Sequence, residues 1–203
     1  NFAEKLESAM PKARLDLLKI VAEAANEQKA ALYIVGGFVR DLLLDRPSQD
    51  FDLVVEGDAI SLARNLQERF GGRLTTHARF GTAKWMLTNI GDELVQALSE
   101  QGHPADLPEF LDLISARTEW YTHPTALPTI ERGSIKLALH RRDFTINTLA
   151  LRIDGRHYGE LHDYWGGLND LREGLVRVLH PLSFVDDPTR MLRAARFEQV
   201  LDF

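Results

Sequence analysis

The segment that most constrains the fold is residues 33–58, YIVGGFVRDLLLDRPSQDFDLVVEGD. A short apolar run rich in β-forming residues, ALYIV at 31–35, ends at a pair of glycines and is followed by the helix-forming sequence FVRDLLL. A cluster of turn residues at 45–48 then separates this helix from a second apolar run, FDLVV at 51–55. The segment predicts a strand, a turn, a helix and another strand, which belong to a mixed α/β domain.

The glycine pair Gly36 and Gly37 lies where the first predicted strand passes into the helix. Because glycine has no Cβ atom, phosphate oxygens can approach the backbone N–H groups at this helix start. Arg40, one turn into the helix, can add a bidentate cationic contact. These residues predict a phosphate-binding site.

Two acids follow the phosphate site closely. Asp50 and Asp52 occupy positions i and i+2 of the second predicted strand, so their side chains leave the same face of it. Neighbouring carboxylates repel each other, and a divalent cation between them is the simplest reason to tolerate the arrangement. Mg²⁺ prefers oxygen ligands together with substrate phosphates, and the sequence contains no cysteine that could supply thiolate ligands. The pair therefore predicts a Mg²⁺ site beside the phosphate site.

A third acid stands in FLDLISA at 110–116, which also reads as a strand. Strand alternation places Asp112 on the face opposite Leu111 and Leu113. Taken alone, Asp112 fits equally well an edge-strand acid that faces solvent. Together with the two earlier aspartates, it predicts a third carboxylate that completes a two-metal site.

The sequence HRRDFTINTLAL at 140–151 carries adjacent charges before an apolar stretch. We expect DFTINTLAL to form a helix that runs into a strand at LRID, with Arg142, Asp143 and Asn147 near the start of the helix. An N-cap role explains Asp143 well. It explains the neighbouring arginine pair less well.

The sequence VDDPTRMLRAARF at 185–197 begins another helix, predicted from Pro188 to Val200. Asp187 supplies the N-cap, and proline is favoured at the first helical position. Three arginines recur at every third position along one side of this helix: Arg190, Arg193 and Arg196. Such a face is usually only solvated, but three arginines after a double acid can also pair with a base edge and with phosphates. Packing is assigned to Met191, Ala194, Ala195 and Phe197.

The remaining segments complete the expected organisation. Helices are expected at 12–29, 60–70, 135–140 and 165–174, strands at 73–77 and 83–88, a polar excursion that interrupts a sheet at 90–109, and a loop at 122–129. We divide the chain into a helical lead-in at 1–29, a mixed α/β head at 30–158 and a mainly helical piece at 159–203.

Composition restricts the class of protein. The 203 residues are 44% hydrophobic, enough for a packed core, and no apolar run approaches the roughly 18 residues that a membrane span needs. No secretory signal is evident at the N-terminus, so we expect a cytoplasmic protein without a membrane partner. The net charge of −6 argues against bulk electrostatic coating of nucleic acid, but it permits a local basic groove.

Four motifs in this order resemble motifs A to D of the class II tRNA nucleotidyltransferase and bacterial poly(A) polymerase family, part of the polymerase β superfamily. They are GGFVRD with DFD, RRDFTIN, YWGGLNDL and DDPTRMLRAARF, and the resemblance covers roughly residues 30–200. It implies an α+β fold, in which a polymerase β-like head with a small mixed sheet flanked by helices precedes the start of a helical neck. Further domains of the same polypeptide are expected before and after this chain.

The resemblance also implies roles for individual residues. Asp50 and Asp52 would be the metal ligands and Asp112 the third catalytic acid. Nucleotide-binding roles fall on Gly36, Gly37 and Arg40 at the triphosphate, Arg142 and Asp143 at the ribose, Asp187 and Arg190 at the base, and Arg193 and Arg196 in support. One departure is Asp186, where the family usually has Glu.

The implied reaction is template-independent nucleotidyl transfer. The 3′-hydroxyl of a tRNA would attack the α-phosphate of CTP or ATP and release pyrophosphate, with Mg²⁺ as cofactor. The resemblance implies that the enzyme adds C, A or both to the tRNA 3′ end, as CCA addition or repair. Within the enzyme class, a poly(A) polymerase or an enzyme restricted to A or to CC addition stays open. The alternative from another class is a non-catalytic nucleotide- or RNA-binding module, against which three acids beside a triphosphate argue, because such a module has little use for concentrated negative charge.

Overall fold

The computed structural model describes residues 1–46, 48, 50–99, 106–120 and 129–203. Its helices are α1 Ala3–Ala9, α2 Lys12–Glu27, α3 Gly37–Leu43, α4 Ala59–Phe70, α5 Asp92–Ser99, α6 Ile135–His140, α7 Gly167–Glu173, α8 Ser183–Asp186 and α9 Thr189–Leu201, with 3₁₀ turns η1 Ala78–Phe80, η3 Thr145–Asn147 and η4 Gly155–His157. Its strands are β1 Ala31–Val35, β2 Asp52–Glu56, β3 Gly71–His77, β4 Thr82–Ile90, β5 Phe110–Ser115, β6 Arg117–Trp120, β7 Thr129–Arg132, β8 Ala150–Arg152 and β9 Glu160–His162.

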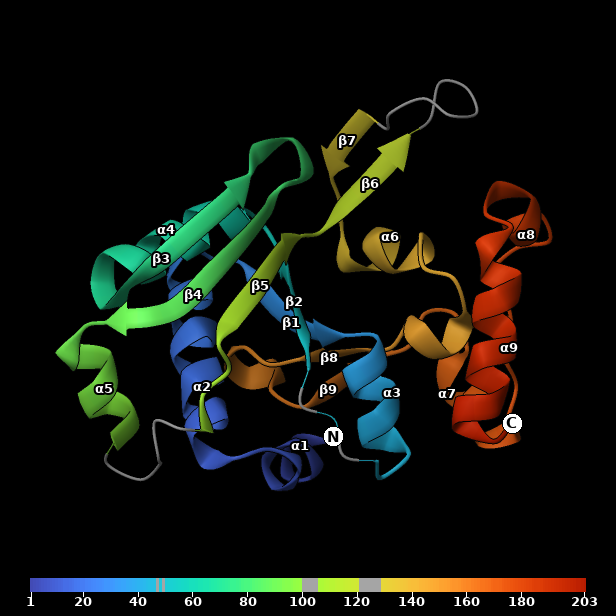
Figure 1. The fold of residues 1–203 in the computed structure, drawn as a ribbon, viewed down its shortest axis with the longest axis horizontal. Helices are drawn as coiled ribbons and strands as arrows, with labels where there is room; N and C mark the ends of the chain where they lie inside the picture. The colour runs from blue at the N-terminus through green and yellow to red at the C-terminus, as the bar shows by residue number, and fades with distance from the viewer. Residues whose placement is uncertain (47, 49, 100–105, 121–128) are drawn as a thin grey trace.

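The strands of the described residues form one mixed sheet and one hairpin (Figure 1). The sheet has seven strands in the order β3-β4-β5-β2-β1-β8-β9, and β2 and β5 are its parallel pair. The hairpin of β6 and β7 extends beyond the carboxyl end of β5. The predicted mixed sheet flanked by helices is confirmed.

Side chains of the central strands alternate between two cores. In β1, Leu32 and Ile34 join the larger core, which contains residues of α2, α3 and α4. Tyr33 and Val35 point to the opposite face and pack with residues of α6. The second face is only partly covered, since α6 is a single short helix. Polar side chains at the uncovered end of that face are therefore open to a ligand.

The segment 143–151 does not form the expected α-helix. It contains only the 3₁₀ turn η3 and then enters β8, which pairs with β1 from Tyr33↔Arg152 to Val35↔Ala150. All residues from 144 to 150 are buried, whereas an amphipathic helix leaves one side exposed. Pairing with the open edge of β1, and the burial of residues 144–150 on all sides, therefore favour a strand over the helix that the sequence pattern predicts.

The polar excursion at 90–109 contains a helix that the sequence reading missed. Helix α5 begins after β4 and buries Leu94 and Leu98 in the larger core, near α2 and α4. The two leucines lie four residues apart, which is the spacing of one helical face. Residues 100–105, and 122–128 of the predicted loop, lie outside the described residues.

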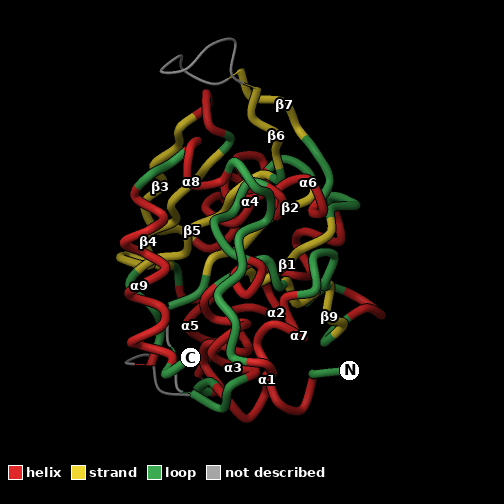
Figure 2. Tube along the Cα trace, turned by 90° about the vertical axis from the view of Figure 1, so that its right-hand side faces the viewer, coloured by secondary structure: helices red, strands yellow, loops and turns green. Residues whose placement is uncertain are grey.

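Residues from all three expected parts of the chain contribute to the larger core. The lead-in helices contribute Leu6 and Leu17 to the larger core, and β9 belongs to the main sheet although it lies beyond residue 158. Helices α8 and α9 run along one side of the molecule, as Figure 2 shows. Within the described residues, no helix has the length and apolar character needed to cross a bilayer.

Candidate active site

Two of the three predicted acids meet on the open face of the sheet. The parallel pairing Leu53↔Leu113 sets Asp52 and Asp112 side by side, one residue earlier on each strand. Both line a cavity of about 300 Å³, together with side chains of β3 and β4 that include His77 and Lys84. Lys84 Nζ lies 3.5 Å from a carboxylate oxygen of Asp112, and both side chains are partly exposed.

Asp50 is not part of this cavity. Strand β2 begins at Asp52, because its pairing with β1 ends at Val35↔Asp52 where β1 gives way to Gly36. The expectation that Asp50 and Asp52 share one strand is therefore wrong, and Asp50 is an exposed residue before the strand. No cluster of three histidine or acidic side chains suited to a metal occurs among the described residues.

Gly36 connects β1 to α3 in a conformation that only glycine adopts readily. Its φ is +74°, and a Cβ atom there would overlap the guanidinium of Arg142. Its N–H donates to the carbonyl of Leu149 at 3.0 Å, which fixes the turn against the segment before β8. The glycine is thus needed to seat an arginine, in addition to any contact with phosphate.

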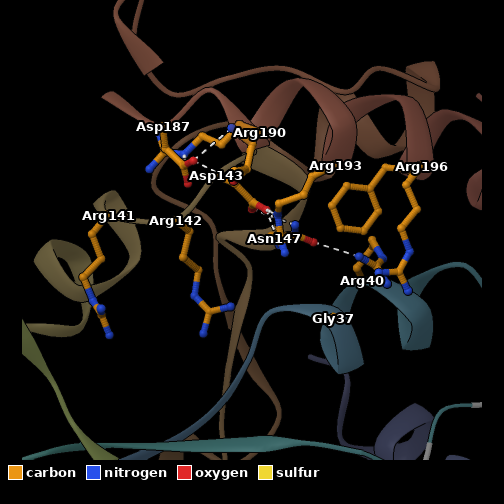
Figure 3. A pocket seen from close by; sticks show the side chains of 12 residues that line it. Gly37, Arg40, Arg141, Arg142, Asp143, Asn147, Asp187, Arg190, Arg193 and Arg196 are labelled. Atoms are coloured by element: carbon orange, nitrogen blue, oxygen red, sulfur yellow. Dashed lines mark hydrogen bonds and ion pairs between the residues drawn. The ribbon is translucent and has the colours of Figure 1, made fainter. Parts of the chain in front are cut away.

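A second cavity, of about 520 Å³, lies between α9 and α3 (Figure 3). We call it the arginine pocket. It is lined by Gly37, Arg40, Arg141, Arg142, Asp143, Asn147, Asp187, Thr189, Arg190, Arg193, Arg196 and Phe197. All the residues for which a nucleotide-binding role was predicted therefore line one cavity, except Gly36, which is adjacent to it.

A network of hydrogen bonds ties three distant segments together in the arginine pocket. Asp143 accepts from Asn147 Nδ2 and from Arg193 Nε, each at 2.8 Å, and Arg40 Nη1 donates to Asn147 Oδ1 at 2.8 Å (Figure 3). Burial opposes ionisation of Asp143, but the hydrogen bonds from Asn147 and Arg193 outweigh it and lower the pKa of the carboxyl. The ring of Phe197 lies 5.1 Å from the Arg40 guanidinium. Helix α9 is thus held against α3 through charged and polar groups.

Arg142 belongs to the arginine pocket and is also influenced by Asp52. Burial lowers the pKa of its guanidinium, while the negative charge of Asp52 acts in the opposite direction. Its side chain lies over Gly36 and lines the arginine pocket. Gly36 directly follows Val35, the pairing partner of Asp52, so Arg142 lies at the border between the arginine pocket and the start of β2.

The start of α9 presents the second acid–arginine pair. Asp187 accepts from the N–H of Thr189 at 3.0 Å, and this contact with the Thr189 side chain and backbone lowers the pKa of Asp187. Arg190 Nε lies 3.8 Å from Asp187, and Arg190 also donates to the hydroxyl of Ser183. The helix begins at Thr189, one residue later than expected.

The packing roles expected along α9 are only partly correct. Ala194 and Phe197 pack against the larger core. Met191 is 54% exposed and Ala195 is exposed as well, so neither serves packing in the described structure. The reason is geometric, because α9 uses one narrow side for the core and turns a second side to the arginine pocket.

Some residues of the two cavities carried no binding role in the sequence reading. Asn147 bridges Asp143 and Arg40, and its position four residues after Asp143 was the available signal. His77 and Lys84 had no signal in the sequence. The pairing of β4 with β5 sets Lys84 opposite Asp112, and the pairing of β3 with β4 brings His77 into the same cavity.

Comparison with known proteins gives consistent matches. A profile of the poly A polymerase head domain matches residues 32–177. The A-adding tRNA nucleotidyltransferase of Geobacter sulfurreducens is 44% identical over 96% of this chain and 20% of its own length. The A-adding tRNA nucleotidyltransferase of Halalkalibacterium halodurans is 40% identical over 97% of this chain and 42% of its own length.

Solved structures agree with these matches. The Thermotoga maritima CCA-adding enzyme complexed with tRNA has a TM-score of 0.80 and 37% identity to this chain, over 100% of this chain and 42% of that one. The chain therefore spans between 20% and 42% of the length of the relatives compared.

Proposed function

Because the chain belongs to the poly A polymerase head-domain family, we propose that it is the catalytic part of a nucleotidyltransferase that extends the 3′ end of tRNA. The observation that carries the proposal is the short link between the two cavities: Asp52 pairs with Val35, and the next residue, Gly36, is covered by Arg142 of the arginine pocket. Nucleotidyl transfer requires a metal site next to a triphosphate site, so the acids that hold the metal must lie near the cations that hold the triphosphate. A protein that acts on tRNA is expected in the cytoplasm.

Nucleotidyltransferases of this family generally use a divalent metal, and we propose Mg²⁺. The donor set fits it, since Asp52 and Asp112 offer only oxygen atoms, lie on one face of the sheet and line one cavity. Bound there, Mg²⁺ would stabilise negative charge at the reacting phosphate. Two carboxylates leave coordination positions for phosphate oxygens and water. Asp50, in the chain segment just before β2, is proposed as a further ligand.

The arginine pocket would bind the incoming nucleotide. Gly37 and Arg40 lie at the start of α3 and would contact the triphosphate. Arg142 and Asp143 would lie at the ribose. Arg193, which is paired with Asp143, would support that contact. Arg196 would neutralise phosphate charge.

The base edge is proposed to meet Asp187 and Arg190. An aspartate accepts hydrogen bonds and an arginine donates them, so the pair can distinguish base edges without a nucleic-acid template. Both relatives compared by sequence are named A-adding enzymes. We therefore favour addition of A over addition of CC, of CCA or of a poly(A) tail.

Two experiments test this proposal on the full-length protein. Asp52→Asn should abolish incorporation of labelled ATP or CTP into a tRNA lacking its 3′ end, while the circular dichroism spectrum stays unchanged. Retained activity would remove Asp52 from the catalytic assignment, and a wild type that binds nucleotide but incorporates none would favour a non-catalytic binding module. Sequencing the products made on tRNAs that end in N, C and CC tests the preference for A.

A further inference from the structure

A second basic cavity, separate from the arginine pocket, lies at the turn between β3 and β4. Its volume is about 380 Å³. We call it the Phe80 cavity, and it is lined by Asp58, Ile60, Arg64, Ala78, Arg79, Phe80, Gly81, Ser115, Arg117 and Arg132. None of these residues lines the arginine pocket.

Backbone and side-chain contacts fix the shape of the Phe80 cavity. The N–H of Ser115 donates to the carbonyl of Gly81 at 2.8 Å, and Arg117 donates to the carbonyl of Phe80. Asp58 caps α4 through the N–H groups of residues 60 and 61 and also pairs with Arg132. The cavity is therefore built by α4, the β3–β4 turn, the β5–β6 junction and β7, which lie close together in Figure 1.

Positive charge exceeds negative charge in the Phe80 cavity. Four arginines line it against one carboxylate, in a chain whose net charge is −6. Asp58 is engaged with Arg132, whereas Arg64 and Arg79 are exposed and form no ion pair with a carboxylate of the described residues. The cavity therefore keeps positive charge available for an anion.

An aromatic ring stands among these cations. Phe80 is 38% exposed, and the guanidinium carbons of Arg79 and Arg117 lie 5.9 and 5.7 Å from its ring centroid. A basic groove that also presents an aromatic ring is the combination that holds single-stranded nucleic acid, because phosphates meet the cations and a base stacks on the ring. An acidic peptide would use the charges and leave the ring without a partner.

The Phe80 cavity lies near the cavity that holds Asp52 and Asp112, at the turn between β3 and β4. Thr75, His77 and Thr82 line the carboxylate cavity, and the residues between His77 and Thr82 form the wall of the Phe80 cavity. One turn of the chain therefore borders both spaces. An RNA strand whose 3′ end lies at Asp52 and Asp112 can continue past this turn of the protein chain.

We propose that the Phe80 cavity binds the phosphodiester backbone of the RNA strand being extended, upstream of its reacting 3′ end. Arg64 and Arg79 contact phosphate oxygens, and Phe80 stacks on an unpaired base. The proposal rests on the proposed function, because it assumes that RNA is the acceptor.

The test uses the full-length protein and a double variant, Arg64→Ala with Arg79→Ala. The affinity for a tRNA lacking its terminal A should fall about tenfold, and the slope of log K against log salt should become shallower by about 1.4, or 0.7 for each lost contact with a single strand. The KM for ATP should stay unchanged. The matched control is Arg69→Ala, which removes an arginine from the same helix outside both cavities.

The outcomes separate this proposal from the proposed function. A wild type that incorporates no nucleotide contradicts the proposed function itself. An active wild type whose double variant binds tRNA with wild-type affinity and salt slope overturns the RNA site. A double variant that raises the KM for ATP instead assigns the Phe80 cavity to a free nucleotide and also overturns the RNA site. Phe80→Leu, which keeps the charges, should weaken tRNA binding without changing the salt slope.

Discussion

The arginine pocket and the carboxylate cavity adjoin each other, yet they are built in different ways. In the arginine pocket, side chains from α3, from the segment before η3 and from α9 are joined by a network through Asp143, Asn147 and Arg40. In the carboxylate cavity, the register of β2 and β5 places Asp52 and Asp112, and Asp112 forms an ion pair with Lys84.

This difference indicates which part of the site is complete before a ligand binds. In the arginine pocket, Asp143, Asn147, Arg40 and Arg193 satisfy one another's polar groups, so this part of the pocket is preorganised. In the carboxylate cavity the ion pair of Asp112 with Lys84 offsets part of the negative charge, and a bound divalent cation would offset more of it. Substitutions in the first region should therefore change stability as well as binding, and substitutions in the second should change chemistry with little cost in stability.

The largest expected effect is that of Asp112→Asn. We expect kcat for nucleotide incorporation to fall by about three orders of magnitude, since loss of a metal-binding carboxylate costs several kcal/mol of charge stabilisation. The free energy of unfolding should stay within about 0.5 kcal/mol of the wild type, because Asp112 is partly exposed and its ion pair with Lys84 is worth little. Single-turnover incorporation and urea denaturation measure the two quantities.

Asp92→Asn, an exposed acid at the start of α5, is the control for Asp112→Asn. It should alter neither quantity. If Asp112→Asn kept its rate, or lost several kcal/mol of stability, the contrast between the two regions would be wrong.

Gly36→Ala should have the next largest effect, and it acts on the border of the arginine pocket. Alanine at φ +74° is strained, and its Cβ atom would displace the Arg142 guanidinium. We expect a loss of about 3 kcal/mol in the free energy of unfolding and a raised KM for the nucleotide. Gly166→Ala is the control, because φ there is +76° and no atom lies within 4 Å of the added Cβ atom.

A double-mutant cycle separates backbone strain from displacement of Arg142. In the Arg142→Ala background, Gly36→Ala should no longer raise the KM for the nucleotide, although the strain remains. Additive effects on KM would show that Gly36 acts on the nucleotide independently of Arg142.

Much of the fold followed from local sequence, and the exceptions have a common cause. The strand ALYIV, the helix closed by Gly71 and the strand of Asp112 were predicted because period and turn residues specify them locally. The segment at 143–151 was predicted wrongly because its state depends on pairing with β1, more than 100 residues earlier. Local pattern cannot report a partner so distant in the chain.

The same reasoning applies to the site. Most residues of the arginine pocket could be named from the sequence because each motif carries its own charged residues, and the resemblance to the family assigns these motifs to one nucleotide. The exclusion of Asp50 from β2, and the approach of Lys84 to Asp112, depend on where strand pairing starts and on its register. Those are properties of the sheet, and no single motif contains them.

Arg40→Ala tests the internal satisfaction of the arginine pocket. Arg40 is 9% exposed, donates to Asn147 and also pairs with Asp41, so its removal leaves a buried amide oxygen without a donor. We expect a loss of about 2 kcal/mol in the free energy of unfolding. Arg73→Ala, an exposed arginine of β3, is the stability control and should change it by less than about 0.5 kcal/mol. If Arg40→Ala and Arg73→Ala lowered the free energy of unfolding equally, the hydrogen bonds of the arginine pocket would not hold α3 in place.

The smallest expected effect is the pH dependence of the contact between Asp143 and Arg193. The pKa of Asp143 is lowered in the folded protein, so its contribution to stability is present above the ordinary carboxyl pKa of about 4 and is lost as the pH falls through the lowered value. The difference in unfolding free energy between wild type and Asp143→Asn should therefore be constant from about pH 5 to 8 and should shrink below about pH 4. Arg193 is half exposed, so its ion pair with Asp143 should be about as strong as an exposed ion pair. We expect this ion pair to account for about 1 kcal/mol or less of the difference. In an Arg193→Ala background the difference should become smaller above about pH 5, where Asp143 is ionised. A difference that instead grew toward acid pH would contradict the ionised state of Asp143 in the folded pocket.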